Sequence, residues 1–246
     1  MTKLVIRSIS RNGLVDMWNA FMVQHARFTK NDIPISRMSQ TIPKELIGWD
    51  EAKNLYKKLL KEDMNFKHPA FIHFYLDDQK FDGKKSSVWL YPYKALKIIK
   101  HFEGVITPDF STNFDFPKAI KAFNTYRMRA FDCFMDLEDI THIHNVRWGT
   151  KETWKYCFDG IPEGSVVSIG TVASGLKQNV HHKLFEDGFT KMIEVIKPKT
   201  IIIYGSSNYE CFNYAKKLGI RIIAFPSATS LAFKKKGGNK DEQGKQ

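Results

Sequence analysis

The stretch "TIIIYGSSNYECFNYAKKLGIRIIAF", residues 200–225, contains one complete unit of the predicted fold. An apolar run at 200–204 predicts a buried strand, and residues 208–218 follow with the apolar spacing of a helix. Gly219 is placed to end that helix, because glycine readily adopts a left-handed backbone. A second apolar run at 221–225 predicts the next strand. This order of strand, helix and strand indicates two parallel strands joined by a crossover.

The same alternation covers the preceding 130 residues or so of the chain. Apolar runs predict strands at 71–76, 104–107, 142–146 and 165–172, and helices are predicted at about 92–102, 117–136, 150–158 and 182–196. We therefore expect an α/β fold of repeated βα units with a mainly parallel sheet, resembling an irregular or incomplete (β/α) barrel. A doubly wound open sheet is the alternative, because it shows the same alternation.

Three regions are expected along the 246 residues. Residues 1–68 should form a mainly helical segment packed on the core, in which "LVIRSI" (4–9) could add a strand. Residues 69–232 should form the α/β core, and residues 233–246 a flexible basic tail. The chain is long enough for one large domain with an appendage.

Charge and composition limit the classes of function. The formal net charge is +12, of which residues 1–70 contribute +5 and residues 234–246 contribute +3. Basic flanks favour a nucleic acid or nucleotide as partner, although a solvated tail is the alternative. The sequence has neither a membrane-spanning apolar run nor a secretory signal, and its three cysteines form no C-x-x-C motif, so a cytoplasmic protein is expected. The oligomeric state stays open.

Carboxylates follow the first two predicted core strands. In folds of this class ligands bind at the carboxyl ends of the strands, so the side chains just after each strand are the candidates for function. Asp77 and Asp78 follow one strand, and Asp109 and Ser111 follow the next. These four residues are the candidate catalytic residues, and their carboxylates suit Mg²⁺ or Mn²⁺ as a cofactor. The alternative is that they cap turns and helices.

Small residues follow two later strands. The segments "GTVASGLK" and "YGSSNYE" could cradle phosphate with backbone N–H groups, although neither is a P-loop. The residues that this reading assigns to ligand binding are Thr171, Ser174, Gly175, Tyr204, Gly205 and Ser206. Helix capping is the alternative role for such residues.

The segment "HIHNVRW" raises two separate possibilities. Asn145, Arg147 and Trp148 lie at a strand end, where Arg can grip phosphate and Trp can stack on a base or simply pack over the sheet. His142 and His144 point to one face of an extended strand and are weak candidates for metal ligands. The sequence shows no third ligand for them.

Several segments together resemble a known family. They are "HFYLDDQKFDG", "SSVWLYPYKAL", "GVITPDFS", "NVRWGTKETWKYCFDGIPEGS", "IGTVASGL" and "TIIIYGSSNY". The chain is similar over most of residues 45–232 to an uncharacterised family of bacterial, phage and mobile-element proteins, a domain of unknown function whose members often end in a basic, Gly-rich tail. The resemblance implies a mobile-element or prophage setting and no established activity.

Three functions are compatible with these observations. The first is an enzyme of unknown reaction that acts on a nucleotide or nucleic acid through the strand ends. The second is a non-enzymatic protein that binds nucleic acid or a host partner through its basic flanks. The third is a rolling-circle nicking endonuclease with His142 and His144 at a metal and Tyr126 or Tyr156 as nucleophile.

Overall fold

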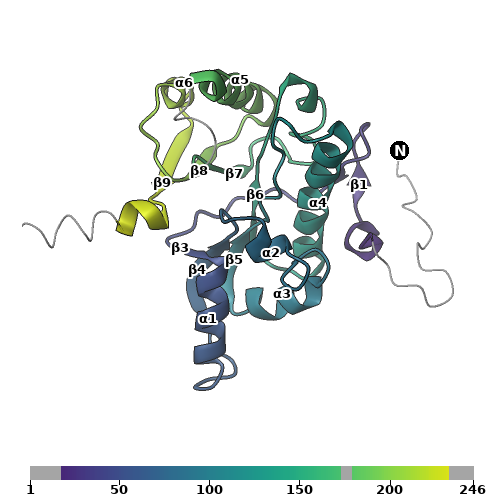
Figure 1. Cartoon of the computed structure of the whole chain (residues 1–246), viewed down its shortest axis with the longest axis vertical. Helices are drawn as coiled ribbons and strands as arrows, with labels where there is room; N and C mark the ends of the chain where they lie inside the picture. Colours follow the sequence, from purple (N-terminus) through teal and green to yellow (C-terminus); the bar gives the residue numbers. More distant parts are fainter. Residues whose placement is uncertain (1–17, 173–178, 233–246) are drawn as a thin grey trace, which may run out of the picture.

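The main sheet of the protein has seven parallel strands that follow one another in chain order. The computed structural model describes residues 18–172 and 179–232. Figure 1 shows these strands as an arc that opens on one side. They are β3 (Leu46–Gly48), β4 (His68–His73), β5 (Phe102–Ile106), β6 (His142–Asn145), β7 (Val166–Gly170), β8 (Thr200–Tyr204) and β9 (Arg221–Phe225).

This strand order explains the shape of the sheet. Because each strand pairs with the next, right-handed crossovers all step in one direction and place the helices on the outer face. Figure 1 shows the helices outside the arc. They are α1 (Trp49–Leu59), α2 (Gln79–Asp82), α3 (Pro92–Ile99), α4 (Lys118–Leu137), α5 (Asn179–Ile196) and α6 (Cys211–Lys217). The α/β prediction is confirmed, and the sheet is a curled half-barrel rather than doubly wound.

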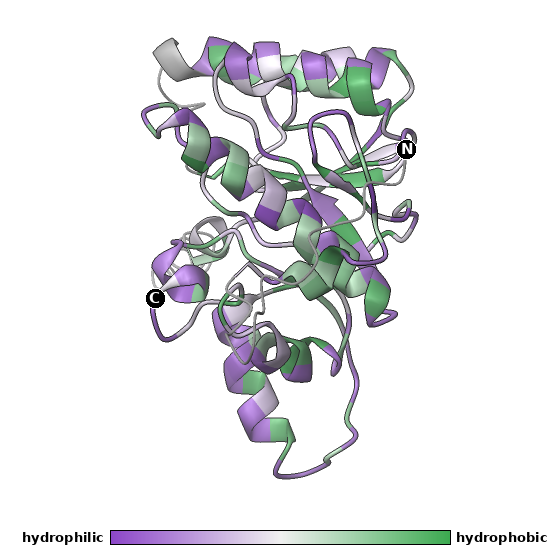
Figure 2. Ribbon diagram, turned by 90° about the vertical axis from the view of Figure 1, so that its right-hand side faces the viewer, coloured by the Kyte–Doolittle hydropathy of each residue, from purple (hydrophilic) through white to green (hydrophobic). Residues whose placement is uncertain are grey.

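Apolar side chains fill both faces of the half-barrel. The concave face is packed with residues such as Phe71, Ile106, Ile143 and Ile202. Two larger cores lie on the convex face, one against α1, α3 and α4 and the other against α5 and α6. Hydrophilic and hydrophobic residues alternate along the helices in Figure 2, as expected of helices that bury one side.

The prediction of a mainly helical N-terminal segment is wrong. Within its described part, a short 3₁₀ helix η1 (Ala20–Val23) and the two-residue strands β1 (Arg27–Phe28) and β2 (Pro34–Ile35) precede β3. Strand β3 is one of the two edge strands of the main sheet and pairs Leu46 with Phe71. Only α1 matches the expected helical character. Residues 4–9 and 233–246 lie outside the described residues.

An extended segment, residues 36–45, crosses the amino ends of the strands, and we call it the strap. Its Ser39 hydroxyl donates to the carbonyl of His142 (2.8 Å), and its Ser39 carbonyl accepts from the N–H of Val166 (2.8 Å). At its far end the Glu45 carbonyl accepts from the N–H of Phe71 (2.9 Å). The strap therefore connects β7, β6 and β4 at the end of the half-barrel opposite the strand carboxyl ends.

A further 3₁₀ helix, η2 (Lys151–Thr153), stands where a longer helix was predicted at 150–158. The turns around it follow β6 and lead toward β7. No helix within residues 18–172 or 179–232 is long and apolar enough to cross a membrane.

Candidate functional site

A buried polar layer lies on the concave face near the carboxyl ends of the strands. The hydroxyl of Tyr75, two residues beyond β4, hydrogen-bonds to Asn145 Oδ1 (3.0 Å) and to Ser168 Oγ (2.7 Å). All three side chains are buried. Burial raises the pKa of Tyr75 well above its ordinary value, and the charge of Asp109 adds to the effect. The hydroxyl therefore stays protonated at neutral pH and acts as a donor.

An ion pair covers this layer at the mouth of the half-barrel. Asn145 Nδ2 donates to Asp109 Oδ1 (2.9 Å), and Arg147 Nη1 donates to Asp109 Oδ2 (2.6 Å). The side chains of Asp109 and Arg147 are 13% and 27% exposed. Arg147 Nη2 donates to Asn113 Oδ1 (3.3 Å). The network thus runs from the buried floor to the solvent.

A second carboxylate, that of Asp78, lies at the mouth and is held there by Ser111. The Ser111 N–H and hydroxyl donate to the two oxygens of Asp78 (3.2 and 3.0 Å). Burial raises the pKa of Asp78, with the charge of Asp109 acting in the same direction. A raised pKa suits a carboxyl group to proton transfer. Asp77, in contrast, is exposed and accepts from the N–H of Gln79 (2.9 Å), which is a turn-capping role.

Helix α4 holds the loops that carry these carboxylates. Arg127 pairs with Asp82 (2.7 Å) in the segment after β4 and lies 3.8 Å from the centre of the Phe110 ring after β5. Asn124 Nδ2 donates to the carbonyl of Ser111. The positions of Asp78, Asp109 and Ser111 are therefore fixed by packing against a 20-residue helix.

Thr171, directly after β7, contacts the loop after β8. Thr171 Oγ1 donates to the Ser206 carbonyl (3.0 Å), and a Cβ at Gly205 would lie 2.4 Å from that hydroxyl. Gly205 also has φ of +117°, a conformation that favours glycine. Tyr204 stacks on Tyr75 with ring centres 5.2 Å apart. Ser174 and Gly175 lie outside the described residues, so the predicted phosphate cradle stays a prediction.

Trp148 packs against helix α5. Its ring centre lies 5.0 Å from that of Phe185, and a Cβ at Gly188 would come within 2.2 Å of the indole. Such close packing favours the structural role of Trp148 over base stacking. Trp148 is therefore separate from the polar network at the mouth.

His142 and His144 lie on the opposite, convex face of β6. Both rings are buried against α4, beside the carboxylate of Asp132, which the sequence did not single out. Tyr156, one of the two nominated nucleophiles, is also buried, and burial raises its pKa to about 12. This burial gives no support to a nicking endonuclease, which must bring its metal and tyrosine to a DNA backbone.

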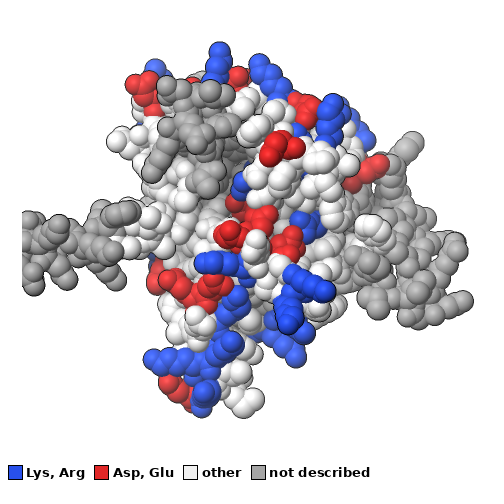
Figure 3. Space-filling view, in the orientation of Figure 1, with Lys and Arg blue, Asp and Glu red and all other residues white. Residues whose placement is uncertain are grey.

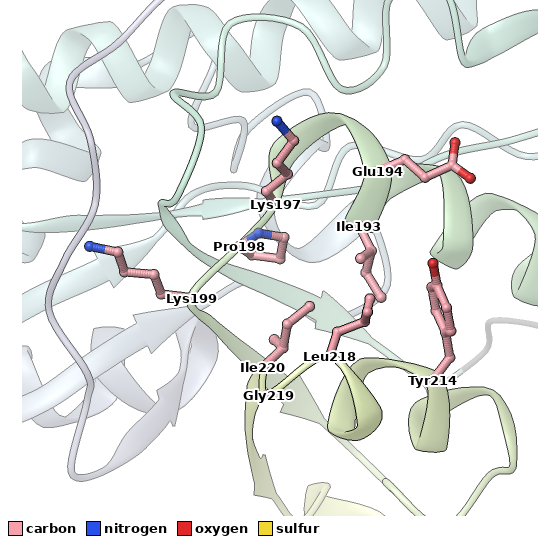
Figure 4. A pocket seen from close by; sticks show the side chains of 9 residues that line it. All are labelled: Ile193, Glu194, Lys197, Pro198, Lys199, Tyr214, Leu218, Gly219 and Ile220. Carbon is pink, nitrogen blue, oxygen red and sulfur yellow. The ribbon is translucent and has the colours of Figure 1, made fainter.

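A cavity of about 560 Å³ lies at the other end of the sheet. Ile193, Leu218 and Ile220 point toward one another there, beside the amino ends of β8 and β9 (Figure 4). Ligands of parallel α/β sheets bind at the carboxyl ends instead. The polar network described above is therefore the better candidate site.

We call this network the carboxyl-end cluster; its members are Tyr75, Asp78, Asp109, Ser111, Asn145, Arg147 and Ser168. Acidic side chains gather near the middle of the face shown in Figure 3, and basic side chains lie below and above them. Sequence reasoning missed Tyr75 and Ser168. Tyr75 falls inside a predicted strand, and the alternation of that strand would have placed it on the same face as Phe71.

Comparison with known proteins agrees with the resemblance seen in the sequence. Two phage proteins named "Gene 1 protein" are relatives. That of Mycobacterium phage L5 is 31% identical over 175 residues, 71% of each chain. That of Mycobacterium phage D29 is 28% identical over 179 residues, 72% of this chain and 62% of the relative. No solved structure matches the chain. A family model described as "Domain of unknown function (DUF4417)" matches residues 26–226, and the chain therefore belongs to the DUF4417 family.

Proposed function

We propose that the carboxyl-end cluster binds a phosphate-bearing ligand, a nucleotide or a nucleic-acid strand, and that the protein acts on it. The observation that carries this proposal is the Asp109–Arg147 pair at the mouth, held from below by the buried Asn145 and Tyr75. A pair anchored in this way is preorganised, so binding a ligand costs little ordering of the side chains.

The chemistry of the cluster supports an anionic ligand with a divalent cation. A guanidinium can grip a phosphate through several N–H groups, and Arg147 is partly exposed. Asp78 and Asp109 offer oxygen ligands of the kind that Mg²⁺ or Mn²⁺ prefers. Such an ion would offset the repulsion between these carboxylates and a phosphate. The raised pKa of Asp78 supports a role for it in proton transfer.

The relatives support a phage or mobile-element setting. Both similar proteins come from mycobacteriophages, and we infer that this chain serves in a prophage or mobile element as well. The basic flanks, which carry most of the net charge of +12, would add affinity for a polymer over a free nucleotide.

Binding of labelled single-stranded DNA, duplex DNA, RNA and a nucleoside triphosphate tests the proposal. Each ligand is titrated at several salt concentrations, with and without Mn²⁺, and cleavage or base modification is then measured on the preferred one. Arg147→Gln should weaken binding by about tenfold or more, because a charge-assisted hydrogen bond is worth about 1.5–3 kcal/mol. Asp109→Asn should reduce the activity that depends on Mn²⁺.

Lys197→Gln is the matched control. It removes the same charge as Arg147→Gln from an exposed residue at the opposite end of the sheet. Equal weakening by both substitutions would point to general electrostatic attraction and would contradict a site at the carboxyl ends. Urea midpoints close to that of the wild type must accompany each loss, since a large drop would make Asp109 a structural residue.

A second candidate function is non-enzymatic binding of nucleic acid through the flanks. The concentration of positive charge at the two ends of the chain favours it, as does the acidic middle of the face in Figure 3. Removal of residues 234–246 should then abolish binding while Arg147→Gln leaves it unchanged. The two functions therefore predict opposite results from the same pair of variants.

A further inference from the structure

Three buried side chains form a cluster between α4 and β6, apart from the carboxyl-end cluster. Asp132, His142 and His144 each offer one ligand atom, and these atoms lie within 4.8 Å of one another. His144 Nδ1 is 3.2 Å from Asp132 Oδ2, and His142 Nε2 is 4.0 Å from Asp132 Oδ1. All three residues are at most 3% exposed.

The local sequence places these groups on facing surfaces. His142 and His144 are two residues apart on a strand and so point to the same face. Asp132 and Asp136 are one helical turn apart on α4 and share the face that covers β6. The cluster thus follows from the packing of one helix on one strand.

The polar atoms of this cluster lack well-aligned hydrogen bonds to the residues that the structure describes. Both oxygens of Asp132 and all four ring nitrogens of the two histidines are buried without a hydrogen-bond partner, although several come close to one another. Arg129 Nε lies 2.9 Å from Asp132 Oδ2 and supplies one positive charge. A fully buried carboxylate with neither oxygen hydrogen-bonded is costly unless something further compensates it.

We propose that Asp132, His142 and His144 bind a divalent transition-metal ion of the zinc class in a buried site with three protein ligands. Two imidazoles and a carboxylate are ordinary ligands of zinc, at metal–ligand distances of about 2.0–2.2 Å. Two ligands of a tetrahedral ion are then about 3.3 Å apart, close to the 3.2 Å between His144 and Asp132. The ligand atom of His142 lies within 4.8 Å of the other two, so the three atoms can close around one ion by small side-chain movements.

The surrounding residues fit the outer shell of such a site. A histidine that binds metal through one ring nitrogen usually donates the other N–H to a carboxylate. Asp136 Oδ1 lies 3.5 Å from His142 Nδ1 and can take that role.

The metal would act on the fold and not on a substrate. The site is buried beneath β6, whereas the carboxyl-end cluster lies on the other face of that strand. Arg129 connects the two, because its Nη2 donates to the carbonyl of Asn145. The inference does not depend on the proposed function, and a failure of one leaves the other standing.

Metal content of the full-length protein, produced without a histidine tag, tests the inference. The wild type should retain about one zinc per chain after gel filtration, and removal with a chelator should lower its melting temperature. Readdition of Zn²⁺ should restore the melting temperature, while Mg²⁺ should not. Co²⁺ in place of zinc should give the visible absorption of a tetrahedral site with nitrogen and oxygen ligands.

Substitutions then locate the site. His144→Asn and His142→Gln should each lower the zinc content at least tenfold, whereas His101→Gln, at a half-buried histidine outside the cluster, should leave it unchanged. Folded wild type with no zinc, no cobalt absorption and no response to Zn²⁺ would overturn the inference. So would zinc that remains bound in both cluster variants, which would place the ion elsewhere on the chain.

Discussion

Strand β6 carries buried polar side chains on both of its faces, and the two faces satisfy them differently. On the concave face the Asn145 amide is bonded on both sides, with Nδ2 donating to Asp109 and Oδ1 accepting from Tyr75. On the convex face the ring nitrogens of His142 and His144 make no well-aligned hydrogen bond within the described residues, although His144 Nδ1 lies 3.2 Å from Asp132 Oδ2. The Asn145 side chain therefore has partners without any ligand. Burying a polar group without a partner is costly, so a further partner would stabilise the convex cluster.

The largest effect is expected from breaking the convex cluster at Arg129. Arg129→Met removes the positive charge beside Asp132 and the donor to the Asn145 carbonyl. The free energy of unfolding should fall by about 3–5 kcal/mol, as is typical when one partner of a buried ion pair is lost. Urea unfolding with and without Zn²⁺ measures it. A loss below about 1 kcal/mol would mean that the Asp132 carboxylate is compensated by other groups.

A buried histidine on the concave face, His73, extends the comparison of the two faces to the dependence of stability on pH. His73 Nδ1 accepts from the N–H of Tyr75 (3.2 Å), and its ring packs against that of Tyr204 with the centres 4.2 Å apart. Burial lowers the pKa of His73 from 6.5 to about 4. Between these values the unfolded chain binds a proton that the folded chain does not, so stability falls as the pH drops from 6.5 to 4. The contribution of His73 is about 3 kcal/mol.

Comparison of wild type with His73→Asn isolates this contribution. Other acidic groups titrate in both proteins and cancel in the difference. The wild type should lose about 3 kcal/mol more than the variant between pH 7 and pH 4, measured by urea unfolding at each pH. Equal losses would show that the ring takes up its proton without leaving its place in the fold.

The smallest effect is expected from removing one hydroxyl of the concave layer. Tyr75→Phe leaves Asn145 Oδ1 and Ser168 Oγ without this partner, which should cost about 1–3 kcal/mol of unfolding free energy. Ser168→Ala tests the same bond from the other side, and the double variant should lose less than the sum of the two. Additive losses would mean that the two hydroxyls do not act as one network.

Much of the fold could be predicted from apolar periodicity. All six predicted core strands, from 71–76 to 221–225, overlap strands of the sheet. Their spatial order could not be read in the same way, because a doubly wound sheet and a half-barrel share the same alternation along the chain. Strand β3 was missed because three residues show no period, and its pairing with β4 is a tertiary contact.

The candidate site was predictable where a residue follows a strand and hidden where it does not. The rule that ligands bind at strand carboxyl ends selected Asp78, Asp109 and Arg147, which the structure brings together. It selected Asp77 as well, because sequence alone does not separate a turn cap from a neighbouring site residue. Asp132 lies within a helix, and it comes beside His142 and His144 only because α4 packs on β6, which follows it in the chain.

The strap has a consequence for the order of folding. Each strand of the sheet pairs with the strand that follows it along the chain. The strap makes much more distant contacts, since Ser39 bonds to His142 and Val166, more than a hundred residues further along the chain. During synthesis from the N-terminus, these partners emerge from the ribosome long after Ser39 does. The strap is therefore synthesised early but can form these hydrogen bonds only after β6 and β7 have been made.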